Sequence, residues 1–252
     1  MIKSSGASRV ATKPMPNDPF LCSELFCGAG GLSEGFQRAG FSILSANDFD
    51  DHAVATMRAT HPETRVILGP IQDVSAKELL RDSGLKKGEL DVLSGGPPCQ
   101  AFSVYNHQRG MHDERSGLFR EYLRIVEELN PKFIVMENVM GILSIEEGLA
   151  VKEIETRLTK LGYQVEHRVL KAEEYGVPQE RRRVFFVANR LGLKFDWPKP
   201  THGNQKNGGN GLKPFVTVWD AIGDLPPLKI LEGEEVQDYG MAAQSDFQKF
   251  LR

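Results

Sequence analysis

The sequence has 252 residues, of which 40% are hydrophobic and 26% are charged, a composition typical of globular proteins. The length fits one full domain and a further fragment. The net charge of −3 gives no basic excess, which argues against a stand-alone nucleic-acid binder. No apolar run approaches the ~18 residues that a membrane-spanning helix requires.

Strand and helix patterns alternate along the chain after a polar leader at residues 1–20. The expected elements, in chain order, are a strand over 21–26, a helix over 32–39, a strand over 42–46, a helix over 51–60, a strand over 65–68, a helix over 76–82, a strand over 90–94, a helix over 116–129, a strand over 132–136, a helix over 149–161, and two late strands over 165–171 and 183–188. This alternation predicts a doubly wound α/β fold with a mostly parallel sheet and a late antiparallel strand. Ligands of such sheets bind outside the carboxyl ends of the strands.

The alternation stops after about residue 198, which predicts a catalytic domain over 21–200. The stretch 202–211 is rich in Gly and Asn and is expected to be a loop. Residues 216–222 favour a short helix or strand, and 232–252 offer no obvious sheet partner. We expect 201–252 to be a loop and the start of an incomplete region.

A glycine-rich turn follows the first expected strand. Gly28 and Gly30 allow a ligand to lie against the backbone, and amides at the next helix start can hold a carboxylate. Asp48, after the second strand, is placed to hold a ribose, and Phe49 to stack on an adenine. A dinucleotide-binding pattern requires glycine at the position of Ser33, so a nucleoside ligand without pyrophosphate fits better than NAD. A purely structural turn is the alternative.

A cysteine and a carboxylic acid follow two neighbouring expected strands. Cys99 lies in the stiff turn GGPPCQ, where its thiolate would be a strong nucleophile. Glu137 ends the next strand, and paired strands lie ~5 Å apart, so a protonated Glu137 could protonate a ring nitrogen during thiolate attack. The alternatives are a buried cysteine and a capping glutamate. Cys22 and Cys27 are interpreted as buried hydrophobes, and the cysteine spacing argues against zinc and disulfides.

A basic cluster precedes the last expected strand. Arg181 and Arg183 alternate, so their side chains are expected to face the same way. A guanidinium there could hold a base oxygen or a phosphate. A solvated charged turn is the alternative.

Four motifs together resemble the cytosine-C5-specific DNA methyltransferases over residues 21–200: FCGAGGLSEGF, GGPPCQAFS, MENV and QERRRVFFVA. The resemblance implies the Rossmann-like fold of the methyltransferases that depend on S-adenosylmethionine. It implies methyl transfer to C5 of a cytosine flipped out of double-stranded DNA. Cys99 would attack C6 while Glu137 supplies a proton at N3. A cytoplasmic enzyme without metal, nucleoid-associated if bacterial and belonging to a restriction–modification system, is expected.

The resemblance also assigns roles to individual residues. Those implied in catalysis are Cys99, Glu137, Arg181 and Arg183. Those implied in cofactor binding are Phe26, Gly28, Ala29, Gly30, Gly31, Asp48, Phe49, Ile71 and Pro97. Those implied in contacts with DNA are Gln100, Ser103, Arg115, Asn138 and Val139, of which the first three belong to a mobile loop that closes over the DNA.

Two departures from the family pattern stand out. Pro70 replaces the aspartate of the usual Gly-Asp-Ile segment, and Asp73 is out of register, so weaker cofactor binding is expected. The family's target-recognition domain and last two motifs would follow residue 252. We therefore expect one part of a split or truncated enzyme, completed by a second polypeptide.

Three other functions stay open at this point. The chain could be a cofactor-binding subunit that is inactive alone. It could be an RNA cytosine-C5 methyltransferase, because the scaffold motifs do not fix the substrate. It could also be an NAD-dependent oxidoreductase, although Ser33 and the cysteine turn argue against that reading.

Overall fold

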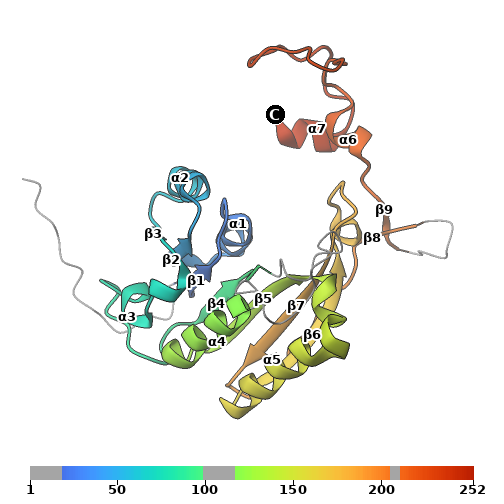
Figure 1. The fold of residues 1–252 in the computed structure, drawn as a ribbon. Coiled ribbons are helices and arrows are strands. Elements are labelled where there is room, and N and C mark those ends of the chain that lie inside the picture. Colours follow the sequence, from blue (N-terminus) through green and yellow to red (C-terminus); the bar gives the residue numbers. More distant parts are fainter. Residues whose placement is uncertain (1–18, 99–116, 205–210) are drawn as a thin grey trace, which may run out of the picture. The chain divides into compact units, whose positions relative to one another are not determined.

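A computed structural model describes residues 19–98, 117–204 and 211–252 (Figure 1). These residues divide into two compact units. Unit 1 comprises the described residues up to 168 together with 184–195, and unit 2 comprises 169–183 and those from 196 onward. The expected domain boundaries at residues 20 and 200 stay predictions.

Seven strands form one sheet in the order β3-β2-β1-β4-β5-β7-β6. Their bounds are β1 Leu21–Leu25, β2 Ser42–Asp48, β3 Arg65–Leu68, β4 Val92–Gly95, β5 Phe133–Val139, β6 Gln164–Lys171 and β7 Arg182–Asn189. The pairings among β3, β2, β1, β4 and β5 are parallel. An antiparallel strand pair completes the sheet, which confirms the expected mostly parallel α/β fold.

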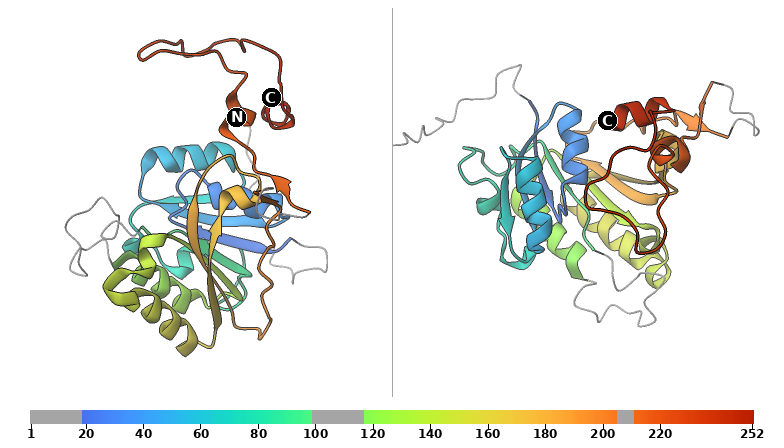
Figure 2. Two further views of the ribbon diagram at one scale, coloured as in Figure 1. Left: turned by 90° about the vertical axis from the view of Figure 1, so that its right-hand side faces the viewer. Right: turned by 90° about the horizontal axis from the view of Figure 1, so that it is seen from above.

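Helices connect the parallel strands and cover the two faces of the sheet. The helices are α1 Gly31–Arg38, α2 Asp51–Thr60, α3 Ala76–Leu79, α4 Leu118–Leu129 and α5 Leu149–Lys160, with short 3-10 turns η1 Ile71–Asp73, η4 Met140–Leu143, η5 Ile145–Gly148 and η6 Ala172–Tyr175. α3 packs on α4 and α4 on α5, on the face opposite to α1 and α2 (Figure 2). Right-handed crossovers between parallel strands require this division.

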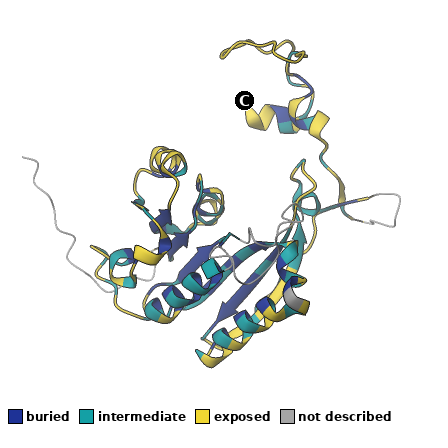
Figure 3. Cartoon of the chain, viewed as in Figure 1, coloured by how far each residue is buried: buried dark blue, intermediate teal, exposed yellow. Residues whose placement is uncertain are grey.

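The core lies on both faces of the central strands, against α4 on one face and α2 on the other (Figure 3). All four residues of β4 are buried, as expected for a parallel strand covered on both faces. α4 buries one stripe of side chains along its length: Phe119, Tyr122, Leu123, Ile125, Val126 and Leu129. Burying each large apolar side chain stabilises the fold by about 1.5–3 kcal/mol.

Unit 2 contains short elements that the sequence signalled only in part. They are β8 His202–Gly203, β9 Lys213–Pro214, α6 Val218–Ile222 and α7 Asp246–Leu251. α6 confirms the expected element over 216–222 as a helix, and β8 occupies the start of the expected 202–211 loop. α7 was not expected, although the side chains of Ser245 and Gln248 form a capping box at its start. Among the described residues, no helix is long and apolar enough to cross a membrane.

Candidate functional site

The turn between β1 and α1 has an unusual backbone. Phe26, Gly28 and Gly30 have positive φ angles of 56°, 52° and 92°. For Phe26 this left-handed conformation costs about 1–2 kcal/mol, and such strain is commonly found at functional sites. The turn is tied to the end of β2, because the Cys27 amide donates to the Asn47 carbonyl at 3.0 Å.

Gly30 occupies a position that only glycine can fill. A Cβ built there would lie 2.5 Å from the sulfur of Met57, on α2, and 3.0 Å from Cε1 of His61, the residue after α2. A Cβ at Gly28 would meet nothing within 4 Å. The two glycines therefore differ, since Gly30 packs against α2 and Gly28 leaves open space beside the backbone.

Asp48 holds two turns together at the end of β2. Its Oδ2 accepts a hydrogen bond of 2.8 Å from the Gly28 amide, and its Oδ1 accepts one of 3.0 Å from the Asp50 amide. A carboxylate oxygen has two lone pairs, so capacity for a ribose hydroxyl is left. The next side chain, Phe49, is 70% exposed and offers a flat apolar surface. Open space, a carboxylate and an exposed ring fit a nucleoside ligand.

A buried acid lies beneath this turn. The hydroxyl of Ser33 donates to the carboxyl of Glu24, and both residues are buried. Burial raises the pKa of Glu24 to about 7, while the Ser33 hydrogen bond opposes the rise. In the sequence, Ser33 stands out only as a residue that replaces the glycine of a dinucleotide-binding pattern. Its α1 position faces Glu24 of β1, a contact that no local pattern signals.

The segment after β3 provides the other wall of the candidate ligand site. The Asn47 side chain donates to the carbonyls of Ile67, at 3.1 Å, and Gly69, at 2.9 Å, which fixes the start of this segment. Ile71 is buried, whereas Pro70 and Asp73 are exposed. Pro70 itself offers no carboxylate to a ligand at this wall.

The acid and the nucleophile turn meet where β4 and β5 end. The strands are parallel neighbours, with Gly95 opposite Met136. A Cβ on Gly95 would lie 2.5 Å from the Leu25 carbonyl oxygen, so this position also requires glycine. A Cβ on Gly96 would lie 3.3 Å from Oε2 of Glu137. The Glu137 carboxyl therefore lies directly against the turn that leads to Cys99.

Asn138 fixes that turn from the same strand. Its Nδ2 donates to the Pro97 carbonyl at 3.0 Å, and its Oδ1 accepts from the Val139 amide at 2.9 Å. Asn138 is buried, so both polar ends of its side chain are satisfied internally. Cys99, together with Gln100, Ser103 and Arg115, lies outside the described residues.

Cys22 and Cys27 are packing residues. Both are free and buried. Burial raises the pKa of each thiol to about 12, which removes the thiolate at neutral pH. This confirms their interpretation as small hydrophobes. In the described ranges, no group of three or more His, Cys, Asp or Glu side chains could hold a metal ion.

The two arginines of the basic cluster belong to unit 2. The Arg181 carbonyl accepts from the Ala172 amide at 2.9 Å, and Nη1 of Arg183 donates to the Arg182 carbonyl at 2.9 Å. Both residues therefore lie where the chain enters β7. Their roles in base contact stay predictions.

A family model of the C-5 cytosine-specific DNA methylases matches residues 20–245. The chain belongs to this family. Among curated relatives, the chain is 39% identical over 244 residues to the type II methyltransferase M.AgeI of Thalassovita gelatinovora, covering 91% of this chain and 57% of that protein. It is 42% identical over 217 residues to M.AquIA of a Picosynechococcus strain, covering 81% of this chain and 88% of that protein.

Solved structures agree with this membership. A structure described as a candidate DNA modification methyltransferase from an E. coli prophage is 30% identical, with a TM-score of 0.67, over 83% of this chain and 56% of that one. The Dnmt2 methyltransferase of S. pombe shares the fold, with a TM-score of 0.56 at 22% identity. The chain spans less than two thirds of M.AgeI but most of M.AquIA.

Proposed function

We propose that this chain is the catalytic part of a DNA (cytosine-5)-methyltransferase. It would act through a covalent bond between the Cys99 sulfur and C6 of a flipped-out cytosine. The main support is the seating of the Glu137 carboxyl against Gly96, with Asn138 bonded to Pro97. An acid that lies against the turn leading to the proposed nucleophile could act on another position of the same ring.

In this mechanism the Cys99 thiolate adds to C6, and the ring electrons move toward N3. Glu137 gives its proton to N3, so no full negative charge develops on the base. C5 would then act as a nucleophile on the methyl group of a sulfonium donor, whose S–CH3 bond breaks and leaves a neutral thioether. The C5 proton then passes to solvent water. The C5–C6 double bond re-forms as the bond to Cys99 breaks, and the N3 proton returns to Glu137.

S-adenosylmethionine is the proposed methyl donor, since it carries an electrophilic methyl group on a sulfonium. Gly28 leaves space beside the backbone, and Asp48 has acceptor capacity for a ribose. The exposed ring of Phe49 and the buried Ile71 would border the adenine. Ala29, Gly30, Gly31 and Pro97 are proposed to complete this site, next to the turn that bears the nucleophile.

Double-stranded DNA is the proposed substrate, and we expect the protein to act in the cytoplasm. We also propose that a second polypeptide supplies target recognition. The region shared with this chain makes up only 57% of M.AgeI, whereas it makes up 88% of M.AquIA. The neighbouring residues Ile230 and Leu231 in unit 2 are 93% and 101% exposed, and adjacent exposed apolar side chains favour a protein partner.

Covalent trapping tests the proposed chemistry. DNA copied with 5-fluorocytosine in place of every cytosine offers all sequence contexts, and fluorine at C5 blocks the release of Cys99. With S-adenosylmethionine present, the wild-type chain should form a denaturation-resistant adduct, and Cys27→Ser should do the same. Cys99→Ser should form none; an adduct with this variant would refute the assignment of the nucleophile.

The same assay separates the alternatives. An adduct formed on fluorinated RNA but not on fluorinated DNA would favour an RNA methyltransferase. Cofactor binding without an adduct on either would favour a subunit that is inactive alone. Robust sequence-specific methylation of DNA by the isolated chain would refute the need for a second polypeptide.

A further inference from the structure

One arginine on α4 holds the segment that follows β3. Nη2 of Arg124 donates to the carbonyl oxygens of Ile71, at 2.9 Å, and Val74, at 3.0 Å. Ile71 is the first residue of the 3-10 turn η1, and Val74 is the residue that follows it. Arg124 lies 53 positions after Ile71 and 50 after Val74, so these contacts exist only in the folded protein.

Two carboxylates fix the guanidinium in this position. Nε of Arg124 donates to Glu121 at 2.8 Å, and Nη1 donates to Glu128 at 2.7 Å. Burial acts to lower the pKa of Arg124, but the hydrogen bonds to the two glutamates outweigh it and raise the pKa. The charge is therefore permanent, and four donor contacts orient the plane of the group.

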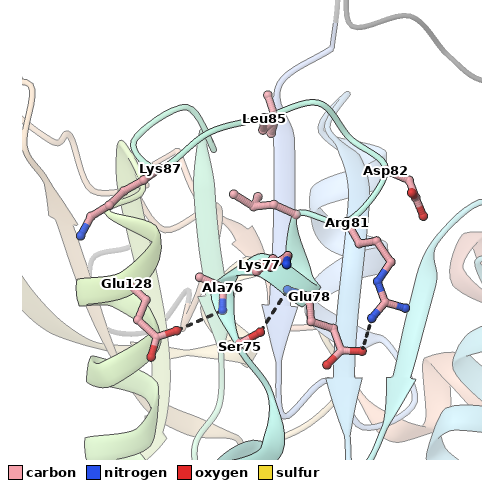
Figure 4. A pocket seen from close by; sticks show the side chains of 10 residues that line it. Ser75, Ala76, Lys77, Glu78, Arg81, Asp82, Leu85, Lys87 and Glu128 are labelled. Atoms are coloured by element: carbon pink, nitrogen blue, oxygen red, sulfur yellow. Dashed lines mark hydrogen bonds and ion pairs between the residues drawn. The ribbon is translucent and has the colours of Figure 1, made fainter.

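Glu128 extends the same link by one step. Its other oxygen, Oε2, accepts a hydrogen bond of 3.1 Å from the Ala76 amide at the start of α3 (Figure 4). Arg124 and Glu128 together thus hold Ile71, Val74 and Ala76. A three-residue turn has little internal stability, so its conformation depends on these contacts from α4.

The held segment is the proposed adenine side of the cofactor site. Pro70 supplies no carboxylate there, so this wall contributes through the shape of Ile71 and the backbone. We propose that Arg124 is a positioning residue that sets this wall, an inference that rests on the function proposed above. Without Arg124, the Ile71 and Val74 carbonyls lose a charged donor, and the turn departs from the geometry that accepts an adenine.

Arg120 provides a matched control on the same helix. It lies one turn earlier and is similarly exposed, with 34% of its side chain accessible against 31% for Arg124. It forms a two-point ion pair with Glu153 of α5, at 2.8 and 2.7 Å. Removal of Arg120 should therefore affect stability without reaching the segment after β3.

The test measures binding of S-adenosylhomocysteine by calorimetry, together with hydrogen exchange of amides 69–80 without ligand. Arg124→Met should weaken binding about tenfold, as expected for two lost hydrogen bonds to a charged donor, and should speed exchange in that segment. Arg120→Met should change affinity by less than about twofold. Arg124→Lys keeps a charge between the glutamates but not the planar fork, so it should bind with intermediate affinity.

The outcomes separate the inference from the function on which it rests. No binding by the wild-type chain would refute the proposed cofactor site itself. Wild-type binding with unchanged affinity and unchanged exchange in Arg124→Met would overturn the positioning role. If Arg124→Met does not fold, Arg124→Lys decides, because wild-type affinity and exchange in that variant would equally overturn it.

Discussion

The side-chain amide of Asn138 donates a 3.0 Å hydrogen bond to the carbonyl oxygen of Pro97. This bond joins the end of β5 to the turn that follows β4. Glu137, the neighbouring residue on β5, places its carboxyl against Gly96 of the same turn. One strand end therefore carries the proposed acid and also fixes the approach to the proposed nucleophile.

Asn138→Ala should lower the rate of covalent trapping at least tenfold, because small displacements of a reacting group cost up to about 100-fold. Affinity for S-adenosylhomocysteine should fall less than the trapping rate, because Pro97 is only one of the residues proposed to border the cofactor. Loss of this hydrogen bond leaves the Pro97 carbonyl unpaired, which costs about 1–3 kcal/mol of folding stability. The free energy of unfolding is therefore measured together with the trapping rate.

Asn189→Ala is the control for that variant. Asn189 is also buried at a strand end, and its Nδ2 donates to the Leu193 carbonyl at 2.7 Å. It should lose comparable stability and keep the trapping rate. Equal trapping rates in the two variants would contradict a specific role for Asn138.

Iodoacetamide at pH 8 should modify Cys99 far faster than the other two cysteines in the native chain. The pKa of Cys22 and of Cys27 is raised to about 12 by burial, so about one thiol in ten thousand is ionised. Mass spectrometry of digested protein checks the site. Denatured protein should take up three labels, and rapid native labelling of Cys27 would contradict its buried position.

The buried carboxyl of Glu24 should make stability depend on pH. Its pKa rises from 4.5 in the unfolded chain to about 7 in the folded chain, and burial is the largest cause of this rise. The folded state then binds more protons than the unfolded state between these values. Stability is therefore lost as pH rises from about 4.5 to 7, by about 3 kcal/mol from this group.

Glu24→Gln should remove that dependence and keep an acceptor for Ser33. Chemical unfolding at several pH values should show the variant gaining on the wild type by about 3 kcal/mol from pH 4.5 to 8. Ser33→Ala should steepen the loss, because the Ser33 hydrogen bond opposes the rise in pKa. Parallel curves for wild type and Glu24→Gln would show that Glu24 titrates normally.

Pro70→Asp should strengthen cofactor binding about tenfold, since a hydrogen bond to a charged group is worth about 1.5–3 kcal/mol. Pro70 is exposed, with φ −64° and ψ 143°, which aspartate adopts without strain. Calorimetry with S-adenosylhomocysteine measures the change. Asp73 is an exposed carboxylate out of register, so Asp73→Asn should leave the affinity unchanged. If Pro70→Asp shows no gain in affinity, the proposal that a carboxylate at this position binds the adenine is wrong.

Local patterns were sufficient for the architecture. The expected helix over 51–60 and the strand over 65–68 match α2 and β3 in their bounds. α7 was missed because six residues carry too little periodicity, although Ser245 and Gln248 give a capping signature. The motifs also located the ends of β1, β4 and β5, because ligand-binding turns and strand ends are adjacent in sequence.

The sequence by itself determined the family, the alternation of strands and helices, and the residue types at the strand ends. Only the tertiary structure decided that Ser33 donates a hydrogen bond to Glu24, that Gly30 packs against Met57, and that Arg124 holds the turn after β3. Periodicity records which side of an element is apolar. Hydrogen bonds between distant residues depend on how the elements pack, which no local pattern encodes.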